Sequence, residues 1–207
     1  MEKFFTHISV DPLVLTLPEK AIFSRLGRNR FLSKIDPAME VRVRLAMLKA
    51  FECCKAKGRW KLLTVTDRSS EYIQFNGHWQ INSRIFSGFV NQSPFVWLGA
   101  VTIGNGLNEL IASTTDSMTD CAVYDAVGSE CADLAIGLLQ KIAAQELLRN
   151  GFTVDLKRFS AGYGGVELTH QQEIFRQLKL EDLQMSLNES CIMQPEKSVT
   201  AFCTVNR

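Results

Sequence analysis

The sequence has 207 residues, enough for one large domain or two small ones, and chains of this size bury roughly two thirds or more of their surface. Its 23 lysine and arginine residues nearly balance 22 aspartate and glutamate residues, so its charge favours neither nucleic acid nor an anionic membrane. The longest apolar run, residues 95–104, is far shorter than the roughly 20 residues that cross a bilayer, and the N-terminus shows no secretory signal pattern. We therefore expect a cytoplasmic protein.

The cysteines do not form a pattern that holds a metal ion. No Cys-x-x-Cys pair is matched by a second pair or by a histidine cluster, and the three histidines are scattered. We expect reduced thiols that serve as small apolar side chains. They stand at Cys53, Cys54, Cys121, Cys131, Cys191 and Cys203.

The first clear element is a helix that begins at Asp36 and Pro37. An aspartate cap followed by proline at the first helical position is a typical helix start, and we expect this helix to end near Gly58. Apolar residues then recur at spacings of three and four, which indicates an amphipathic helix. These residues are Val41, Leu45, Leu48 and Phe51.

The middle of the chain predicts a small antiparallel sheet. Short runs rich in β-forming residues flank a turn at 67–70 and then Asn76-Gly77, the strongest two-residue hairpin signal. Residues 93–113 follow as a buried strand, a glycine turn and a short helix.

A long helix follows between residues 117 and 149. This stretch has no proline, is rich in Ala, Leu and Ile, and stops at Asn150-Gly151, a pair suited to a left-handed cap. It predicts either one unusually long helix or two helices with a bend near Gly128.

The last third alternates again between strand and helix. Residues 152–159 and 198–205 predict strands, and Thr169 with Gln172 predicts a capping box for the helix between them. No repeat or interdomain linker is visible. This mixed order of elements indicates the α+β class, and we expect one domain over residues 1–207.

A glycine-rich loop is the first candidate site. A strand that ends in Arg158 and is followed by Gly162, Gly164 and Gly165 brings backbone N–H groups and a cation together, which suits a carboxylate or phosphate. Tyr163 stands among these glycines, so its ring must fold onto the core or cover a bound group. The alternative is a glycine-rich turn whose arginine pairs with a nearby carboxylate.

The long helix carries the second candidate. Asp125, Ser129 and Asp133 recur every four residues and share one face, which could present a carboxylate opposite Arg158. Gly128 lies among them and costs about 1 kcal/mol in a helix relative to alanine. The alternative is that Gly128 lets a neighbouring element pack closely while Asp125 caps a bend.

Four motifs, in this order, resemble the C-terminal activation domain of cobalamin-dependent methionine synthase, and especially its short stand-alone homologues. They are "DAVGS" at 125–129, "RFSAGYG" at 158–164, "IFRQL" at 174–178 and "NESCIMQPEKSVTAF" at 188–202. The motifs fall within residues 117–207, and roughly the first 90 residues are similar in layout only. The resemblance implies a mainly antiparallel twisted sheet with one long helix and flanking helices.

The resemblance also implies a site for S-adenosylmethionine. In that family an Arg-x-x-x-Gly-Tyr motif binds this ligand, so Arg158 would pair with its carboxylate and the backbone of residues 160–164 would hold its polar groups. Tyr163 would lie near the sulfonium, where a cation–π contact fits. The acidic helix residue of the family would fall at Asp133. The implied ligand residues are Arg158, Ala161, Gly162, Tyr163, Asp133 and Ser129.

The function implied by the resemblance is reactivation of a corrinoid protein. Cobalamin would be held in trans by a methionine synthase or another corrinoid methyltransferase, with a flavoprotein or ferredoxin as electron donor. Binding of S-adenosylmethionine would support reductive methylation of oxidised cobalamin on that partner. Two alternatives are an S-adenosylmethionine-binding protein with other chemistry and a docking adaptor that binds no ligand. An independent enzyme with Asp133 or Glu189 as base is a further alternative.

Overall fold

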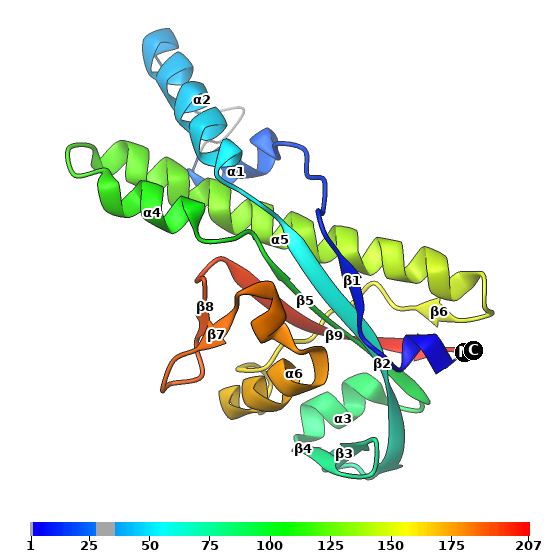
Figure 1. Cartoon of the computed structure of the whole chain (residues 1–207). Coiled ribbons are helices and arrows are strands. Elements are labelled where there is room, and N and C mark those ends of the chain that lie inside the picture. The colour runs from blue at the N-terminus through cyan, green and yellow to red at the C-terminus, as the bar shows by residue number, and fades with distance from the viewer. Residues whose placement is uncertain (1, 28–35) are drawn as a thin grey trace.

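The centre of the molecule is a seven-stranded antiparallel sheet (Figure 1). The structure is a computed structural model and describes residues 2–27 and 36–207. The strand order is β4-β3-β2-β5-β9-β6, and β1 pairs with the first part of β2. The α+β class with a mainly antiparallel sheet is thereby confirmed. The three long central strands are β2 (Lys57–Arg68), β5 (Phe95–Thr102) and β9 (Ser198–Asn206).

The predicted hairpin lies at one end of this sheet. Strands β3 (Tyr72–Phe75) and β4 (Trp79–Asn82) pair in register and are joined by Asn76 and Gly77. Both turn residues have positive φ, 50° and 77°, as a two-residue turn matched to the strand twist requires. The short β1 (Ile8–Val10) extends the same sheet along the first part of β2.

The strand expected over residues 152–159 is mostly absent, so this prediction was wrong in extent. Only β6 (Thr153–Val154) pairs with β9, and the chain returns to the sheet at a single bridge between Phe159 and Phe202. The Asp155 carboxylate accepts a hydrogen bond from the Lys157 N–H at 3.1 Å. Such a local turn competes with strand pairing, because the side chain replaces the partner strand.

One helix, α5 (Met118–Leu148), crosses a full face of the sheet without interruption. Ser117 caps it by accepting a hydrogen bond from the Asp120 N–H at 3.2 Å. The helix is therefore single, and the alternative of two helices with a bend near Gly128 is not observed. Its buried side chains pack on Trp60, Leu62 and Trp97 from the central strands.

Gly128 allows close packing against this helix. A Cβ atom there would lie 2.4 Å from Leu107 and 3.0 Å from Lys197. Leu107 belongs to α4 (Gly106–Ser113), the short helix expected after the glycine turn. A larger residue at position 128 would push α4 and Lys197 away from α5, so the packing explanation of this glycine applies.

Helices on the other face of the sheet enclose a second group of buried apolar residues. The rings of Phe75, Phe86 and Phe202 contact one another there, with the last two centroids 5.2 Å apart. The elements that cover this face and extend it are α3 (Arg84–Val90), η2 (Leu168–His170), α6 (Gln171–Leu178), η3 (Leu180–Leu183) and the hairpin of β7 (Ser186–Leu187) with β8 (Met193–Gln194).

The capping box predicted for Thr169 is wrong. The turn η2 runs directly into α6, so Thr169 lies inside a helical turn rather than ahead of the helix. Its hydroxyl donates to Glu167 at 3.2 Å, and α6 has no side-chain cap.

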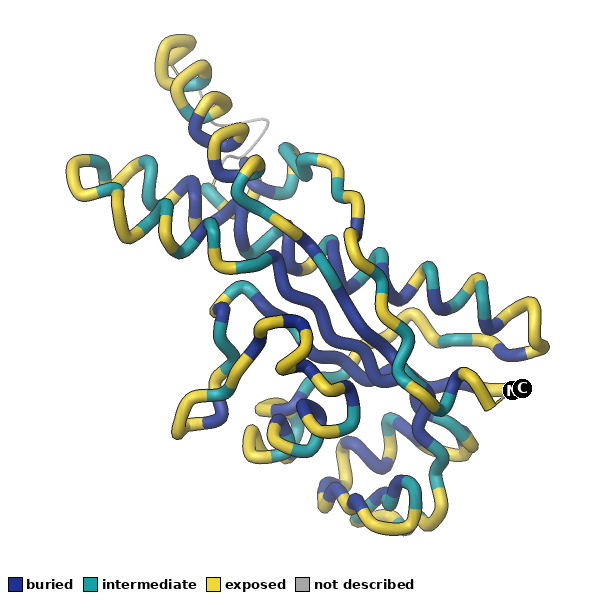
Figure 2. Tube along the Cα trace, in the orientation of Figure 1, coloured by how far each residue is buried: buried dark blue, intermediate teal, exposed yellow. Residues whose placement is uncertain are grey.

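The helix predicted after Asp36 is confirmed as α2 (Pro37–Glu52), although it ends earlier than Gly58. It follows the first short helices, η1 (Glu2–Phe4) and α1 (Glu19–Arg25). An amphipathic stripe normally faces the core, but here the buried residues lie on the other side, and α2 projects beyond the body of the molecule (Figures 1 and 2). No helix within residues 2–27 or 36–207 is both long enough and apolar enough to cross a membrane.

Replacing Gly99 by alanine tests how tightly the sheet is packed. A Cβ atom at Gly99 would lie 2.1 Å from the Trp97 ring, which is itself fully buried and cannot move aside. We expect Gly99→Ala to lower the free energy of unfolding by about 1–3 kcal/mol in urea denaturation. Gly88→Ala is the control, since no atom lies within 4 Å of its Cβ position and alanine favours the helix. Equal stability of the two variants would contradict this packing.

His170 makes stability depend on pH. Its Nδ1 accepts a hydrogen bond from the Trp79 indole at 3.2 Å, and burial lowers the His170 pKa below the ordinary value of about 6.5. The unfolded chain therefore binds a proton here more readily, and this contribution to stability is complete above pH 6.5 and falls as the pH drops below it. We expect His170→Asn to reduce the loss of unfolding free energy between about pH 7.5 and 5.5. Thr169→Ala should keep the full loss.

Candidate functional site

The glycine-rich loop after Arg158 closes on itself. The Gly162 N–H donates to the Val166 carbonyl at 2.8 Å, and the Val166 N–H donates to the Tyr163 carbonyl at 2.9 Å. Gly162, Gly164 and Gly165 have positive φ, between 55° and 89°, a region that other residues rarely adopt. The loop therefore needs its glycines for its shape.

Two contacts attach this loop to α3 and the sheet. Ser83, the cap of α3, donates its hydroxyl to the Gly164 carbonyl at 2.6 Å. The Ser160 hydroxyl donates to the Thr200 carbonyl of β9 at 2.9 Å. Within the described part of the chain, the N–H groups of Tyr163, Gly164 and Gly165 donate no hydrogen bond. Consecutive free N–H groups of this kind are suited to an anion.

Arg158 lies against α5. Its Nη1 donates to Gln140 Oε1 at 3.0 Å, and the Gln140 amide donates to the Asp155 carbonyl at 2.7 Å. Gln140 is buried, with 5% of its surface exposed, and its amide oxygen holds the Arg158 guanidinium against α5. Among residues 2–27 and 36–207, no carboxylate lies within ion-pair distance of Arg158. The alternative of a turn whose arginine pairs with a carboxylate is therefore not what the structure shows.

Asp133 lies on the same side of α5 as the residues that meet Arg158. Gly137 and Gln140 follow it by four and seven residues, so Asp133 is about 10 Å from Gln140 along the helix axis. A Cβ atom at Gly137 would lie 3.5 Å from Arg158 Nη1. The Asp133 side chain is mostly exposed, with Arg25 at 3.8 Å. The structure thus places the predicted carboxylate and Arg158 along one face of α5.

A groove runs beside this face, between α5 and an N-terminal segment. Its volume is about 320 Å³, and Asp133 and Gly137 form part of its wall. Arg158 does not line the groove, but its Nη1 lies 3.5 Å from where a Cβ atom of the lining residue Gly137 would stand, so its guanidinium is near the edge. The remaining lining residues are Val14, Leu15, Thr16, Leu134, Leu138 and Lys141.

Ser129 lies one turn from Asp133, but its hydroxyl already accepts a hydrogen bond from Lys197. Lys197 donates to Ser129 at 3.0 Å and to Asp125 at 2.5 Å. The turn before β9, which supplies Lys197, therefore covers this end of the face. A ligand that reached Ser129 from Asp133 would therefore meet Lys197 there.

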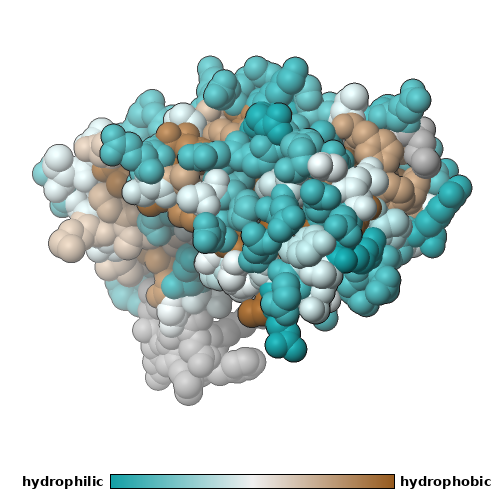
Figure 3. Space-filling view, turned by 90° about the horizontal axis from the view of Figure 1, so that it is seen from below, coloured by the Kyte–Doolittle hydropathy of each residue, from teal (hydrophilic) through white to brown (hydrophobic). Residues whose placement is uncertain are grey.

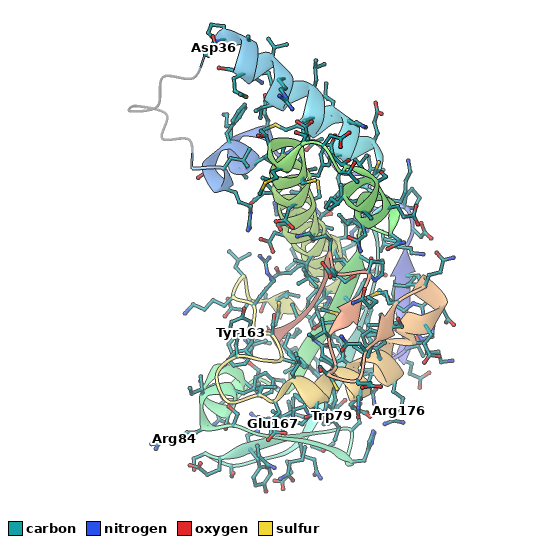
Figure 4. The ribbon with its side chains drawn as sticks, turned by 90° about the vertical axis from the view of Figure 1, so that its left-hand side faces the viewer. Asp36, Trp79, Arg84, Tyr163, Glu167 and Arg176 are labelled. Carbon is teal, nitrogen blue, oxygen red and sulfur yellow. The ribbon has the colours of Figure 1, made fainter. Side chains whose placement is uncertain are left out.

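Tyr163 and Ala161 point in opposite directions. Tyr163 is 73% exposed at the outer side of the loop, as Figure 4 shows, so its ring does not fold onto the core. Ala161 is buried in the cluster that contains Phe202, which leaves only its backbone for a ligand.

Sequence reasoning missed Gln140 and Gly137, the residues that position Arg158. A glutamine at helical spacing from the apolar Ile136 and Ala143 is the signal that could have identified the first, because a buried amide requires partners. Burial raises the pKa of the nearby Cys203 thiol to about 12, although the Arg158 charge acts in the opposite direction. Cys203 is thus a neutral neighbour of the site.

Comparison with known proteins gives a match in structure but none in sequence. No family model matches the chain, and no curated protein sequence matches it. The crystal structure of the MetH reactivation domain bound to AdoHcy is similar, with a TM-score of 0.64 over 97% of this chain and 78% of that chain. The chain has the reactivation-domain fold. The resemblance found in the motifs is confirmed at this level. Because sequence identity is 15%, the likeness concerns the reactivation-domain fold alone.

Replacement of Gln140 tests whether it anchors Arg158 and the loop. We expect Gln140→Leu to lower the free energy of unfolding by about 1–3 kcal/mol, since the Asp155 carbonyl loses its buried donor. Gln145→Leu on the exposed side of α5 is the matched control and should change stability by less than about 0.5 kcal/mol. Urea denaturation measures both, and equal effects would show that Gln140 has no anchoring role.

Proposed function

We propose that this chain binds S-adenosylmethionine along α5 and the glycine-rich loop. The observation that carries the proposal is the state of Arg158, the arginine of the Arg-x-x-x-Gly-Tyr sequence. It is fixed by a buried amide, it has no carboxylate partner among the described residues, and it stands beside a groove. The similar MetH domain was crystallised with AdoHcy, which supports the same class of ligand here.

The residues present fit the polar parts of this ligand. Arg158 can form a charge-assisted pair with a carboxylate, and the free N–H groups of residues 163–165 can hold further oxygen atoms. Asp133, about two turns of α5 away, can accept hydrogen bonds from an amino or hydroxyl group. The absence of a side chain at Gly137 lets the Arg158 guanidinium lie close to α5 on the same face.

The exposed loop is suited to methyl transfer to a large partner. S-adenosylmethionine supplies an electrophilic methyl group on its sulfonium when it is bound. Tyr163 would lie beside that positive charge, where an aromatic ring is favourable. Since Tyr163 is exposed, a bound methyl group near it would be accessible from outside.

The partner that fits is a corrinoid protein. We propose a reactivation role for cobalamin-dependent methionine synthase or a related corrinoid methyltransferase, with cobalamin held in trans and an electron from a flavoprotein or ferredoxin. The chain itself would hold the methyl donor and present it to the corrin. The proposal for this partner rests on the shared fold and on the motif order.

A docking adaptor that binds no ligand is the second candidate. Lys197 favours it, because this side chain already donates hydrogen bonds to Ser129 and Asp125. The exposed Ile85, which lies beside the loop at Gly164, also favours a docking surface. In this case the loop would bind the corrinoid partner directly.

Titration of the purified chain with S-adenosylmethionine separates these functions. We expect calorimetry to show binding and Arg158→Ala to weaken it by more than about 1.5 kcal/mol, roughly tenfold or more, because a charge-assisted hydrogen bond is lost. Lys157→Ala removes a neighbouring exposed charge and should leave the affinity unchanged.

Two results would contradict the proposal. If folded Arg158→Ala binds as tightly as the unaltered chain, the ligand lies elsewhere. If the unaltered chain binds no S-adenosylmethionine but binds a cobalamin protein without it, the adaptor function is correct.

A further inference from the structure

Helix α2 carries an apolar stripe that nothing in the described structure covers. Val41, Leu45 and Leu48 are 58%, 62% and 50% exposed, and their spacing places them on one side of the helix. The side that contacts α5 carries Ala46, Met47 and Ala50 instead. Figure 2 shows the outer turns of α2 as largely exposed. The side of α2 that has the sequence pattern of a buried face is therefore exposed to solvent.

This stripe differs from the rest of the described surface. Of twelve large apolar side chains exposed there, three form this stripe, while Met39 of α2 lies on the opposite side of the helix. Seen from below, at the end away from α2, the surface is mainly hydrophilic and its apolar residues form small patches (Figure 3). Single exposed apolar residues are common, but a continuous stripe on a projecting helix indicates an interaction surface.

Cations border the stripe on both flanks. At 100° per residue, Arg42 and Lys49 lie on one flank and Arg44 lies on the other. Both arginines already have acidic partners, because Arg42 pairs with Asp120 of α5 at 3.2 Å and Arg44 pairs with Glu40 of α2 and Glu19 of α1. The exposed Glu52 lies in line with the stripe, one turn after Leu48.

Lys49 differs from the two arginines. It forms no ion pair within the described residues and lies 5.9 Å from the Tyr124 ring centre. Lys49 is therefore the cation beside the stripe that a partner carboxylate can bind without displacing an ion pair of the described residues.

These charges disfavour an antiparallel pair of α2 helices from two copies of the chain. Such a pair, centred on Leu45, would place Arg42 beside Lys49 of the other copy and Arg44 beside its own counterpart, which costs affinity. A parallel pair would place Arg42 between Arg44 and Glu40 of the other copy, so charge gives it no net gain.

We propose that the exposed face of α2 binds an amphipathic helix of a partner protein, with an aliphatic stripe and glutamate or aspartate on its flanks. Helix-to-helix packing would bury Val41, Leu45 and Leu48. An acidic flank would pair with Lys49, while Arg42 and Arg44 keep their present partners. The surface is separate from the proposed ligand site, because α2 meets α5 near Asp120 while Arg158 meets it at Gln140. Loss of one need not affect the other.

Two labelled synthetic helices provide the test. They share a leucine stripe at helical spacing, and one carries glutamate and the other lysine at the flanking positions. Fluorescence anisotropy with the full chain should show the glutamate helix binding at least about tenfold tighter, with the difference shrinking as salt rises. Leu45→Asn should weaken this binding about tenfold, while Leu148→Asn, an equally exposed leucine at the far end of α5, should not.

Charge reversal makes the test specific. Lys49→Glu breaks no ion pair among the described residues, so the helix should remain folded, as circular dichroism can verify. We expect this variant to lose several-fold affinity for the glutamate helix and to gain affinity for the lysine helix.

Four outcomes would overturn the proposal. Equal binding of both helices would remove the selection by charge, and no binding would remove the surface. A dimer in sedimentation that Leu45→Asn abolishes would assign the face to a second copy. Binding to vesicles of anionic phospholipid that exceeds binding to the glutamate helix and depends on Leu45 would assign it to a membrane surface.

Discussion

The structure depends on the close packing of α5 against the central strands. Gly58 of β2 lets Leu139 and Val101 approach to about 3 Å from where a Cβ atom would stand. The Leu139 side chain of α5 therefore packs directly on the backbone of β2. Because α5 is long, it also supports α2 near its beginning, α4 at Gly128 and Arg158 near Gln140. The positions of both proposed surfaces thus follow from one helix–sheet contact.

Local sequence signals were sufficient where the chain determines its own geometry. The Asn76-Gly77 hairpin forms as expected, and α5 is the first of the two alternatives for residues 117–149, because turn chemistry and the absence of proline act within a few residues. The shortened strand β6 and the missing cap at Thr169 show the limit, because a side-chain hydrogen bond of Asp155 and a preceding 3-10 turn changed the outcome. The stripe on α2 shows a different limit, since periodicity identifies an apolar face but not what covers it.

The charged groups of the candidate site could be predicted from the sequence, but the residues that hold them in place could not. Arg158 and the glycines of the loop can be recognised from their residue types, and Asp133 was found through its helical spacing. Gln140 and Gly137 act only because folding brings α5 beside the loop, eighteen residues away in sequence from Gln140 to Arg158. Lys197 is farther still, and its contact with Ser129 depends on the position of β9. Such long-range partners leave no pattern in a single sequence.

The contact between Gln140 and Arg158 uses one donor of the guanidinium and leaves the others for a ligand. A neutral amide oxygen holds one N–H of Nη1, and that amide is buried and hydrogen-bonded to the Asp155 carbonyl. Because a guanidinium carries five N–H groups in one plane, a carboxylate can form a charge-assisted pair with the remaining donors without displacing Gln140. The glutamine thus sets the plane of the guanidinium, and with it the direction from which an anion is bound.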